Sequence, residues 1–386
     1  MKLTILMPCL NEQKSISHAI KAAKIFLKKE KIHGEILIAD NGSVDNSVKI
    51  AKSLGCRVIH IKERGYGAAL IGGIKNAKSE YVIFADCDGS YDFSKIKIFY
   101  NHLKNNYDFV IGNRFSGGIE KGAMPFLHKY LGNPVLSFLG KVFFNIKIND
   151  FHCGLRALKK SFFLKLGIHC KGMEFASELV AVASYNNANF IEVPIKLHKD
   201  KRGGDSSHLR TWSDGWRHLK LILCLAPKLS LFYPGLMFLM ITGIFQGFYL
   251  FNPNYLNKLL NINFSFFSTL YINFFNWLGL GMILVALMSF KKIIYQYKLK
   301  FQKKSLFNIL CNFKSDSCFQ IFGLICLYEF YLFIPMFLFW KKNLFQFFDI
   351  NLFKQNIIVA NYFLPFLFFF FLLGFVNYLS ELYEKK

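Results

Sequence analysis

Short apolar runs alternate with longer amphipathic stretches along the first 228 residues of this 386-residue chain. The apolar runs have the length of strands, and the amphipathic stretches have the length of helices. Such alternation with short links predicts the α/β class, with a mostly parallel sheet that is covered by helices and binds its ligands at the carboxyl ends of its strands. The predicted strands are 3–7, 35–39, 57–61, 81–85 and 109–112, and the predicted helices are 14–30, 44–54, 67–77 and 93–105.

Long and almost uncharged segments dominate the rest of the chain, and each can cross the ~30 Å hydrocarbon core of a bilayer. Just before them, Trp212 and Trp216 stand among cationic residues, which favours a helix in the headgroup region, although an ordinary packed helix can have this pattern. We predict an α/β domain over 1–208, an amphipathic juxtamembrane helix over 209–228, and an all-α membrane domain over 229–386. The long apolar segments are 229–251, 264–290, 318–340 and 357–379.

The charge of the chain fits this membrane interpretation. Lysine and arginine number 48 against 24 aspartates and glutamates, a formal +24 that by itself suggests nucleic acid or an anionic membrane. Because the apolar segments already indicate a membrane, an anionic membrane surface is enough to explain the positive charge, and we expect no nucleic-acid partner. Seven lysines lie in 291–314, whereas the first connection has only Lys258, which predicts a multi-pass plasma-membrane protein with a cytoplasmic N-terminal domain. Lys341, Lys342 and Lys354 in the third connection weaken this orientation.

Two carboxylates, Asp86 and Asp88, directly follow the fourth apolar run. Carboxylates there can bind Mg²⁺ or Mn²⁺ against the phosphates of a nucleotide diphosphate. The motif alone is weak, because a surface turn can also contain two aspartates. Its context strengthens it, since the other strand ends are polar as well, at 8–12, 40–45 and 63–67. Together they predict one crevice.

The glycine-rich segment 64–70 does not complete a dinucleotide-binding motif, because Leu70 occupies the third glycine position. The segment also follows the third predicted strand and not the first. What remains is a close backbone approach at Gly67, at a helix N-terminus, with Arg64 beside it. Both suit a nucleotide phosphate.

Several motifs occur in a fixed order along the chain. They are Pro8-x-x-Asn11-Glu12, Asp40-Asn41-Gly42-Ser43-x-Asp45, Gly65-Tyr66-Gly67 and Asp86-x-Asp88. This series resembles the signature of family 2 glycosyltransferases, which have the GT-A fold. Later motifs at 112–115, 154–156 and 172–178 extend the resemblance to polyprenyl-phosphate sugar synthases, such as dolichyl-phosphate mannose and glucose synthases. The resemblance covers about residues 1–210.

The resemblance implies that Pro8, Glu12 and Asp40 cradle the nucleoside of a nucleotide-diphosphate sugar, with Asn11 in the same motif. One departure concerns this pocket. Asn41 stands where many members of the family have a second aspartate, so one acceptor is lost.

The same resemblance assigns Asp86 and Asp88 to the donor and metal site, in agreement with the Mg²⁺ or Mn²⁺ site predicted above. It also implies that Arg114 meets phosphate charge. A second basic residue of this kind is expected in a segment before the membrane helices, where Lys201 and Arg202 are the candidates.

The implied reaction is inverting transfer of a sugar to a polyprenyl phosphate at the cytoplasmic face by a hexosyltransferase. A lipid phosphate is already anionic, so alignment and charge stabilisation suffice without a strong base. A hydroxyl acceptor requires a base, for which Glu178 or Glu174 is the nearest candidate, although either can equally pair with a cation at a helix surface. Ala176 stands where dolichyl-phosphate mannose synthases have a glutamine, so any metal contact from that side chain is absent.

Two alternatives remain open. The same fold can serve a glycerolipid, sphingoid or polysaccharide acceptor, although the chain lacks a Gln-x-x-Arg-Trp-like motif of processive synthases. The apolar segments can instead form a lipid-sugar flippase or a non-catalytic anchor. Glu329 is the only charged residue in these segments, which offers little of the polar path that a transporter needs.

Overall fold

The computed structural model describes residues 2–203, 211–251, 266–299, 306–311, 313–342 and 354–384. Its contacts divide the chain into two compact units. The first unit comprises Met1–Leu225 and Tyr295–Lys300, and it contains the sheet. The second comprises Ala226–Ile294 and Phe301–Lys386, and it contains most of the long apolar helices.

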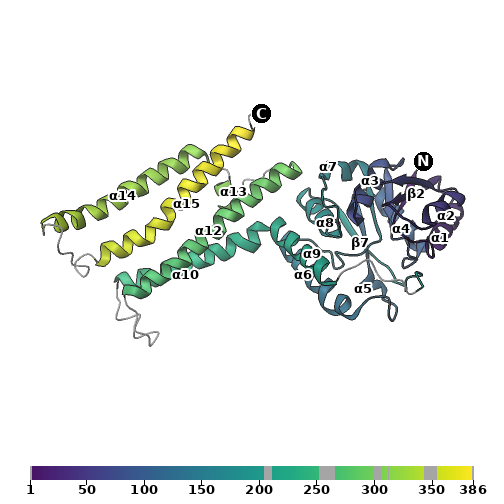
Figure 1. Ribbon diagram of the computed structural model, residues 1–386, viewed down its shortest axis with the longest axis horizontal. Helices are drawn as coiled ribbons and strands as arrows, with labels where there is room; N and C mark the ends of the chain where they lie inside the picture. Colours follow the sequence, from purple (N-terminus) through teal and green to yellow (C-terminus); the bar gives the residue numbers. More distant parts are fainter. Residues whose placement is uncertain are drawn as a thin grey trace. The chain divides into compact units, whose positions relative to one another are not determined.

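Within the described residues, seven strands form one sheet in the order β3-β2-β1-β4-β6-β5-β7. Figure 1 labels β2 and β7 of this sheet. Strands β1 to β4 pair in parallel, as do β5 and β7, whereas β6 runs antiparallel to both β4 and β5. The mostly parallel α/β sheet is therefore confirmed. The strands are β1 Leu3–Cys9, β2 Gly34–Asp40, β3 Arg57–His60, β4 Tyr81–Phe84, β5 Phe109–Asn113, β6 Arg156–Lys159 and β7 Phe190–Pro194.

Strand β1 pairs with β2 on one side and β4 on the other, and it is buried at every position. Leu6 lies opposite Leu37 of β2 and Phe84 of β4. A Cβ built on Gly73 in helix α3 would lie 2.4 Å from the Leu6 side chain, so this glycine lets the helix approach the sheet closely.

Helices of the first unit connect and cover the strands. Helix α1 contacts α2, while α3 contacts α7 and α8, and α6 contacts both α8 and α9. A short 3₁₀ turn, Phe93–Lys95, precedes α4, and a π-helical turn, His128–Gly132, precedes α6. The helices are α1 Ile16–Lys29, α2 Ser47–Ser53, α3 Tyr66–Asn76, α4 Ile96–Lys104, α5 Arg114–Gly117, α6 Asn133–Phe144, α7 Lys160–Leu166, α8 Phe175–Tyr185 and α9 Thr211–Leu225.

The predicted juxtamembrane stretch 209–228 contains α9, although residues 204–210 lie outside the described part of the chain. Helix α9 is amphipathic. His218 and Ile222 are buried, whereas Trp212 and Trp216 are 77% and 58% exposed. Contacts assign α9 to the same unit as the sheet.

The described residues of the second unit are almost all helical. Among the described residues, four helices are long and apolar enough to cross a membrane, at Lys228–Phe248, Ile272–Tyr297, Ser315–Lys342 and Asn356–Asn377. They overlap all four predicted segments. The full helices are α10 Tyr233–Phe251, α12 Phe266–Tyr297, α13 Leu306–Cys311, α14 Ser315–Lys342 and α15 Lys354–Glu384, and a π-helical turn, Lys228–Phe232, precedes α10.

Small and polar side chains join α10 to α12. Gly235 and Gly279 bring the two backbones together, because a Cβ on Gly235 would lie 2.7 Å from the Gly279 carbonyl oxygen. Thr242 donates a hydrogen bond to Asn276 in the same interface. Close approach at small residues and hydrogen bonds between polar ones are typical of helix packing in membranes.

Candidate active site

A cavity of about 1050 Å³ lies in the first unit, at the C-terminal ends of β1, β2 and β4. Parallel sheets bind ligands at this edge, because the loops that follow their strands converge there. The structure brings together in its wall the predicted site residues Pro8, Glu12, Arg64, Asp86, Asp88, Arg114 and Arg202.

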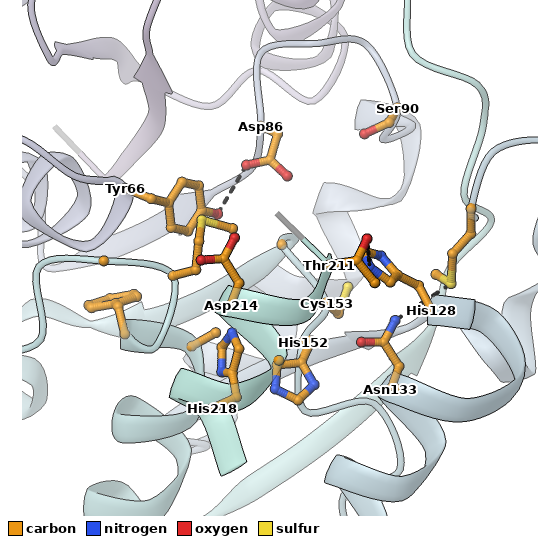
Figure 2. Close-up of a pocket in the computed structure, with 18 of the residues that line it drawn as sticks. Tyr66, Asp86, Ser90, His128, Asn133, His152, Cys153, Thr211, Asp214 and His218 are labelled. Carbon is orange, nitrogen blue, oxygen red and sulfur yellow. Dashed lines mark hydrogen bonds between the residues drawn. The ribbon is translucent and has the colours of Figure 1, made fainter. Parts of the chain in front are cut away.

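Asp86 and Asp88 are held by different partners. Asp86 Oδ1 accepts a 3.0 Å hydrogen bond from the Tyr66 hydroxyl (Figure 2). Asp88 Oδ1 accepts bonds of 2.9 and 2.6 Å from the backbone N–H and hydroxyl of Ser90. Burial, and then the negative charge of Asp88, raise the pKa of Asp86 to about 7. A carboxylate whose charge is disfavoured by a neighbouring carboxylate is stabilised when a cation binds beside it.

This carboxylate pair fits a hard divalent cation. Within the described residues, no group of three or more His, Cys, Asp or Glu side chains could hold a metal. The protein would therefore supply two carboxylates, and phosphate oxygens and water would complete the coordination, which is the usual arrangement for Mg²⁺.

Gly154 allows Asp86 to take this position. A Cβ at residue 154 would lie 2.5 Å from Asp86 Oδ2 and 2.9 Å from the Tyr91 hydroxyl, which accepts the hydrogen of the Gly154 N–H at 2.8 Å. These are closer than real Cβ contacts, so the carboxylate or the loop must move if a methyl group is added.

We expect Gly154→Ala to lower turnover at least about tenfold, because misplacing one catalytic group by about 1 Å can cost more than that. The measurement is the initial rate of the transfer reaction that the resemblance of the sequence implies. Gly323→Ala is the control, since a Cβ there meets nothing within 4 Å and should leave the rate unchanged. Equal rates for the two variants would contradict a role for the position of Asp86.

The end of β2 is fixed by hydrogen bonds around Asp40. Its carboxylate accepts from the backbone N–H groups of Gly42 and Ser43 at 3.3 and 3.0 Å, and it lies 2.9 Å from His60 Nδ1. Although burial raises the pKa of Asp40, these hydrogen bonds outweigh burial and lower it. Asp40 is thus an ionised residue that shapes the loop next to the cavity.

Asn41 has a structural role that an aspartate could not take over. Its amide donates to the carbonyls of Ile61 and Glu63 at 3.3 and 2.6 Å, while its Oδ1 accepts from the Gly65 N–H at 2.7 Å. A carboxylate cannot donate to carbonyl oxygens. Asn41 therefore has one acceptor fewer than an aspartate, but its amide links the end of β2 to the loop that follows β3. Arg64 also joins these two segments, because it donates a hydrogen bond to the Asn41 carbonyl at 2.8 Å.

Arg202 lies between two carboxylates of the cavity. Its guanidinium makes a bidentate pair with Glu12, with Nε–Oε2 at 3.1 Å and Nη2–Oε1 at 2.5 Å, and its Nη2 lies 3.6 Å from Asp88 Oδ2. The backbone N–H of the neighbouring Lys201 donates to the Asp88 carbonyl at 2.8 Å, which holds this part of the chain against the loop that follows β4. A guanidinium at this position can also bind the phosphates of a ligand through the N–H groups that Glu12 does not use.

Arg114 has a buried partner that the sequence did not predict. Its Nε and Nη2 both donate to the Asp150 carboxylate at 2.7 Å, and its backbone N–H donates to the same group at 3.0 Å. Asp150 is completely buried. Burial lowers the pKa of Arg114, but the charge of Asp150 raises it further, so the guanidinium stays charged. These bonds leave Nη1 for a ligand.

Histidines line another part of the cavity wall (Figure 2). The Ser177 hydroxyl lies 3.1 Å from His152 Nε2 and 2.8 Å from His218 Nδ1. Burial lowers the pKa of His218 to about 4 and that of His152 well below its usual value, so both rings are neutral near pH 7. Only the fold joins these residues, and no spacing in the sequence predicts the cluster.

Other predicted residues lie beside the cavity and not in its wall. Asn11 accepts a 2.9 Å hydrogen bond from the Val44 N–H, which joins the loops after β1 and β2. Gly67 packs against the Cys170 carbonyl, and Lys201 Nζ lies 2.7 Å from His18 Nε2. Glu178, at the start of α8, is completely buried and also lies outside the cavity wall.

Comparison with known proteins identifies the family to which the chain is similar. The model of the family described as Glycosyl transferase family 2 matches residues 4–167. The UDP-N-acetylglucosamine--dolichyl-phosphate N-acetylglucosaminyltransferase of Methanococcus voltae is 30% identical over 216 residues, which are 50% of this chain and 84% of that protein. Low-salt glycan biosynthesis hexosyltransferase Agl6 of Haloferax volcanii is 33% identical over 234 residues, 60% of this chain but only 56% of Agl6.

Two further similarities are more distant. The dolichyl-phosphate hexose transferase of Haloferax volcanii is 27% identical over 172 residues, 45% of this chain and 72% of that protein. Glucosyl-3-phosphoglycerate synthase from Mycobacterium tuberculosis, in a crystal structure with Mn²⁺, UDP and glucosyl-3-phosphoglycerate, has a TM-score of 0.44 and 15% identity, covering 58% of this chain and 78% of that one. The family match confirms the resemblance inferred from the ordered motifs.

Proposed function

Because this chain belongs to glycosyl transferase family 2, we propose that it transfers a sugar from a nucleotide-diphosphate sugar to a polyprenyl phosphate. In this proposal the transfer inverts the anomeric carbon and depends on Mg²⁺ or Mn²⁺. The second unit anchors the enzyme in the plasma membrane, with the catalytic domain on the cytoplasmic side. Two relatives whose names specify dolichyl phosphate support this choice of acceptor.

The observation that carries the proposal is that one cavity joins the Asp86–Asp88 pair to Arg114 and to an apolar surface. The carboxylates suit the cation and the diphosphate of a sugar donor. Arg114 suits the phosphate of an acceptor, because a guanidinium binds phosphate through several donors at once. For a reaction between a nucleotide sugar and a lipid phosphate, the carboxylate pair and Arg114 must lie in the same cavity.

The apolar surface lies along α9, α6 and the turn before α6. Leu131, Val135, Trp212 and Trp216 line the cavity and are also exposed to the outside, by 53%, 46%, 77% and 58%. Phe138, on α6, is 63% exposed. An apolar rim with tryptophans is typical of a surface that contacts lipid. A prenyl chain could therefore stay in apolar surroundings while its phosphate enters the cavity.

The chemistry follows from the charges in the cavity. An oxygen of the lipid phosphate forms a bond to the anomeric carbon, and the bond from that carbon to the diphosphate oxygen breaks. Asp86 and Asp88 would hold the cation, which would supply positive charge against the leaving diphosphate. Arg114 and Arg202 reduce the repulsion between two phosphate-bearing substrates.

No residue must remove a proton in this reaction, because the attacking phosphate is already ionised. The burial of Glu178 outside the cavity wall agrees with this view. A hydroxyl acceptor would instead need a base, and Glu178 does not reach the cavity wall to serve as one.

The test incubates purified protein with a panel of nucleotide sugars and with polyprenyl phosphate, diacylglycerol or a short oligosaccharide as acceptor. Mass spectrometry identifies the product. We expect a polyprenyl-phosphate sugar that forms only with Mg²⁺ or Mn²⁺ and disappears with EDTA. Glycosylated diacylglycerol or oligosaccharide as the only product would overturn the acceptor. Movement of lipid-linked sugar across vesicles without consumption of nucleotide sugar would favour a flippase.

A further inference from the structure

The buried carboxylate of Glu178 binds a loop and the last residue of α12. Its oxygens accept from the backbone N–H of His169 at 3.0 Å and of Cys170 at 2.7 Å. Its Oε1 also accepts from the Tyr297 hydroxyl at 2.7 Å. Tyr297 is 3% exposed, and contacts place Tyr295–Lys300 in the same unit as Glu178. Glu178 therefore has three donors and no exposure to solvent.

The loop that Glu178 binds holds the start of helix α3. The backbone N–H of Ala68 donates to the Lys171 carbonyl at 3.0 Å, and that of Gly67 donates to the Gly172 carbonyl at 3.2 Å. A Cβ on Gly65 would lie 2.1 Å from the Lys171 carbonyl oxygen. Loop and helix thus touch backbone to backbone, and a shift of one must shift the other.

Tyr66 stands between Gly65 and Gly67 and donates its hydroxyl hydrogen to Asp86 Oδ1 at 3.0 Å. The position of this hydroxyl is therefore set by the same backbone contact. Partners of this kind fix the orientation of a carboxylate ligand, and their loss typically weakens metal binding about 10- to 100-fold.

We propose that Glu178 and Tyr297 are positioning residues, which fix the loop against α3 so that Tyr66 holds Asp86 in the orientation that binds the divalent cation. This inference rests on the assignment of Asp86 to the metal in the proposed function. In this inference Glu178 acts through the contact of the loop with α3 and through the hydrogen bond of Tyr66 to Asp86, and it does not act as a base at the substrate.

The test measures Mn²⁺ binding to the full-length protein with UDP or GDP present, by the electron paramagnetic resonance signal of free Mn²⁺. Tyr66→Phe should weaken Mn²⁺ binding about tenfold, and Tyr297→Phe roughly threefold to tenfold. In the proposal, Tyr297 affects the metal site only through the position of the Tyr66 hydroxyl. The double variant should therefore bind Mn²⁺ no more than about twofold more weakly than Tyr66→Phe alone.

Tyr295→Phe is the matched control, since Tyr295 is 74% exposed and two residues away, and it should bind Mn²⁺ like the unaltered protein. A purely structural role for Tyr297 would lower the melting temperature or the number of sites without changing their affinity. An unchanged Mn²⁺ affinity in Tyr297→Phe, or effects that multiply in the double variant, would overturn the inference alone. Absence of Mn²⁺ binding in the unaltered protein would overturn the metal assignment as well.

Discussion

Asp88→Asn is expected to lower the rate of sugar transfer about 100- to 1000-fold while the protein stays folded. Asparagine keeps an oxygen that can accept the two hydrogen bonds of Ser90, so the local structure has little reason to change. It removes one of the two negative charges in the proposed metal site, and it also removes the charge that lies 3.6 Å from Arg202, which keeps its bidentate pair with Glu12. The measurements are initial rates over a range of Mn²⁺ concentrations, together with thermal unfolding.

Asp108→Asn is the control for this change. Asp108 is a partly exposed carboxylate that lies 3.4 Å from Lys159 Nζ and does not line the cavity. We expect its rate to stay within about twofold of the unaltered protein, since exposed ion pairs contribute little. An Asp88→Asn protein that retains full activity at every Mn²⁺ concentration would exclude Asp88 as a metal ligand.

The central part of the sheet could be predicted because each strand there is a continuous buried run. The predicted strand 35–39 is the core of β2, Gly34–Asp40, and the predicted strand 81–85 differs from β4 by one residue. Strand β6, Arg156–Lys159, was not predicted. It has four residues, it carries an arginine and a lysine, and its position depends on pairing with β4 and β5.

The site shows the same division. Residues that directly follow strands could be grouped from the sequence, because the C-terminal ends of parallel strands share one edge of the sheet. Partners that come from distant segments could not. Asp150 is 36 residues from Arg114, and Tyr297 is 119 residues from Glu178. Such pairs form only when the chain has folded, and local patterns of polarity contain no information on them.

Arg114→Met is expected to abolish sugar transfer and to lower the free energy of unfolding by about 3–5 kcal/mol. The large effect on stability arises because Asp150 is completely buried and would keep a charge without a cationic partner. Urea unfolding and initial rates measure the two effects separately. Arg57→Met is the matched control, because Arg57 also pairs bidentately with a carboxylate, Glu35, but its side chain is 30% exposed and lies away from the cavity.

The double variant Arg114→Met/Asp150→Asn separates the two roles of Arg114. Asparagine carries no charge and can still accept from the backbone N–H of residue 114, so most of the lost stability should return. Activity should not return, because the cation proposed to face the acceptor phosphate is still missing. If the double variant regained both stability and activity, Arg114 would be a structural residue only, and the phosphate would have to be bound by Arg202 or by the histidines of the cavity wall.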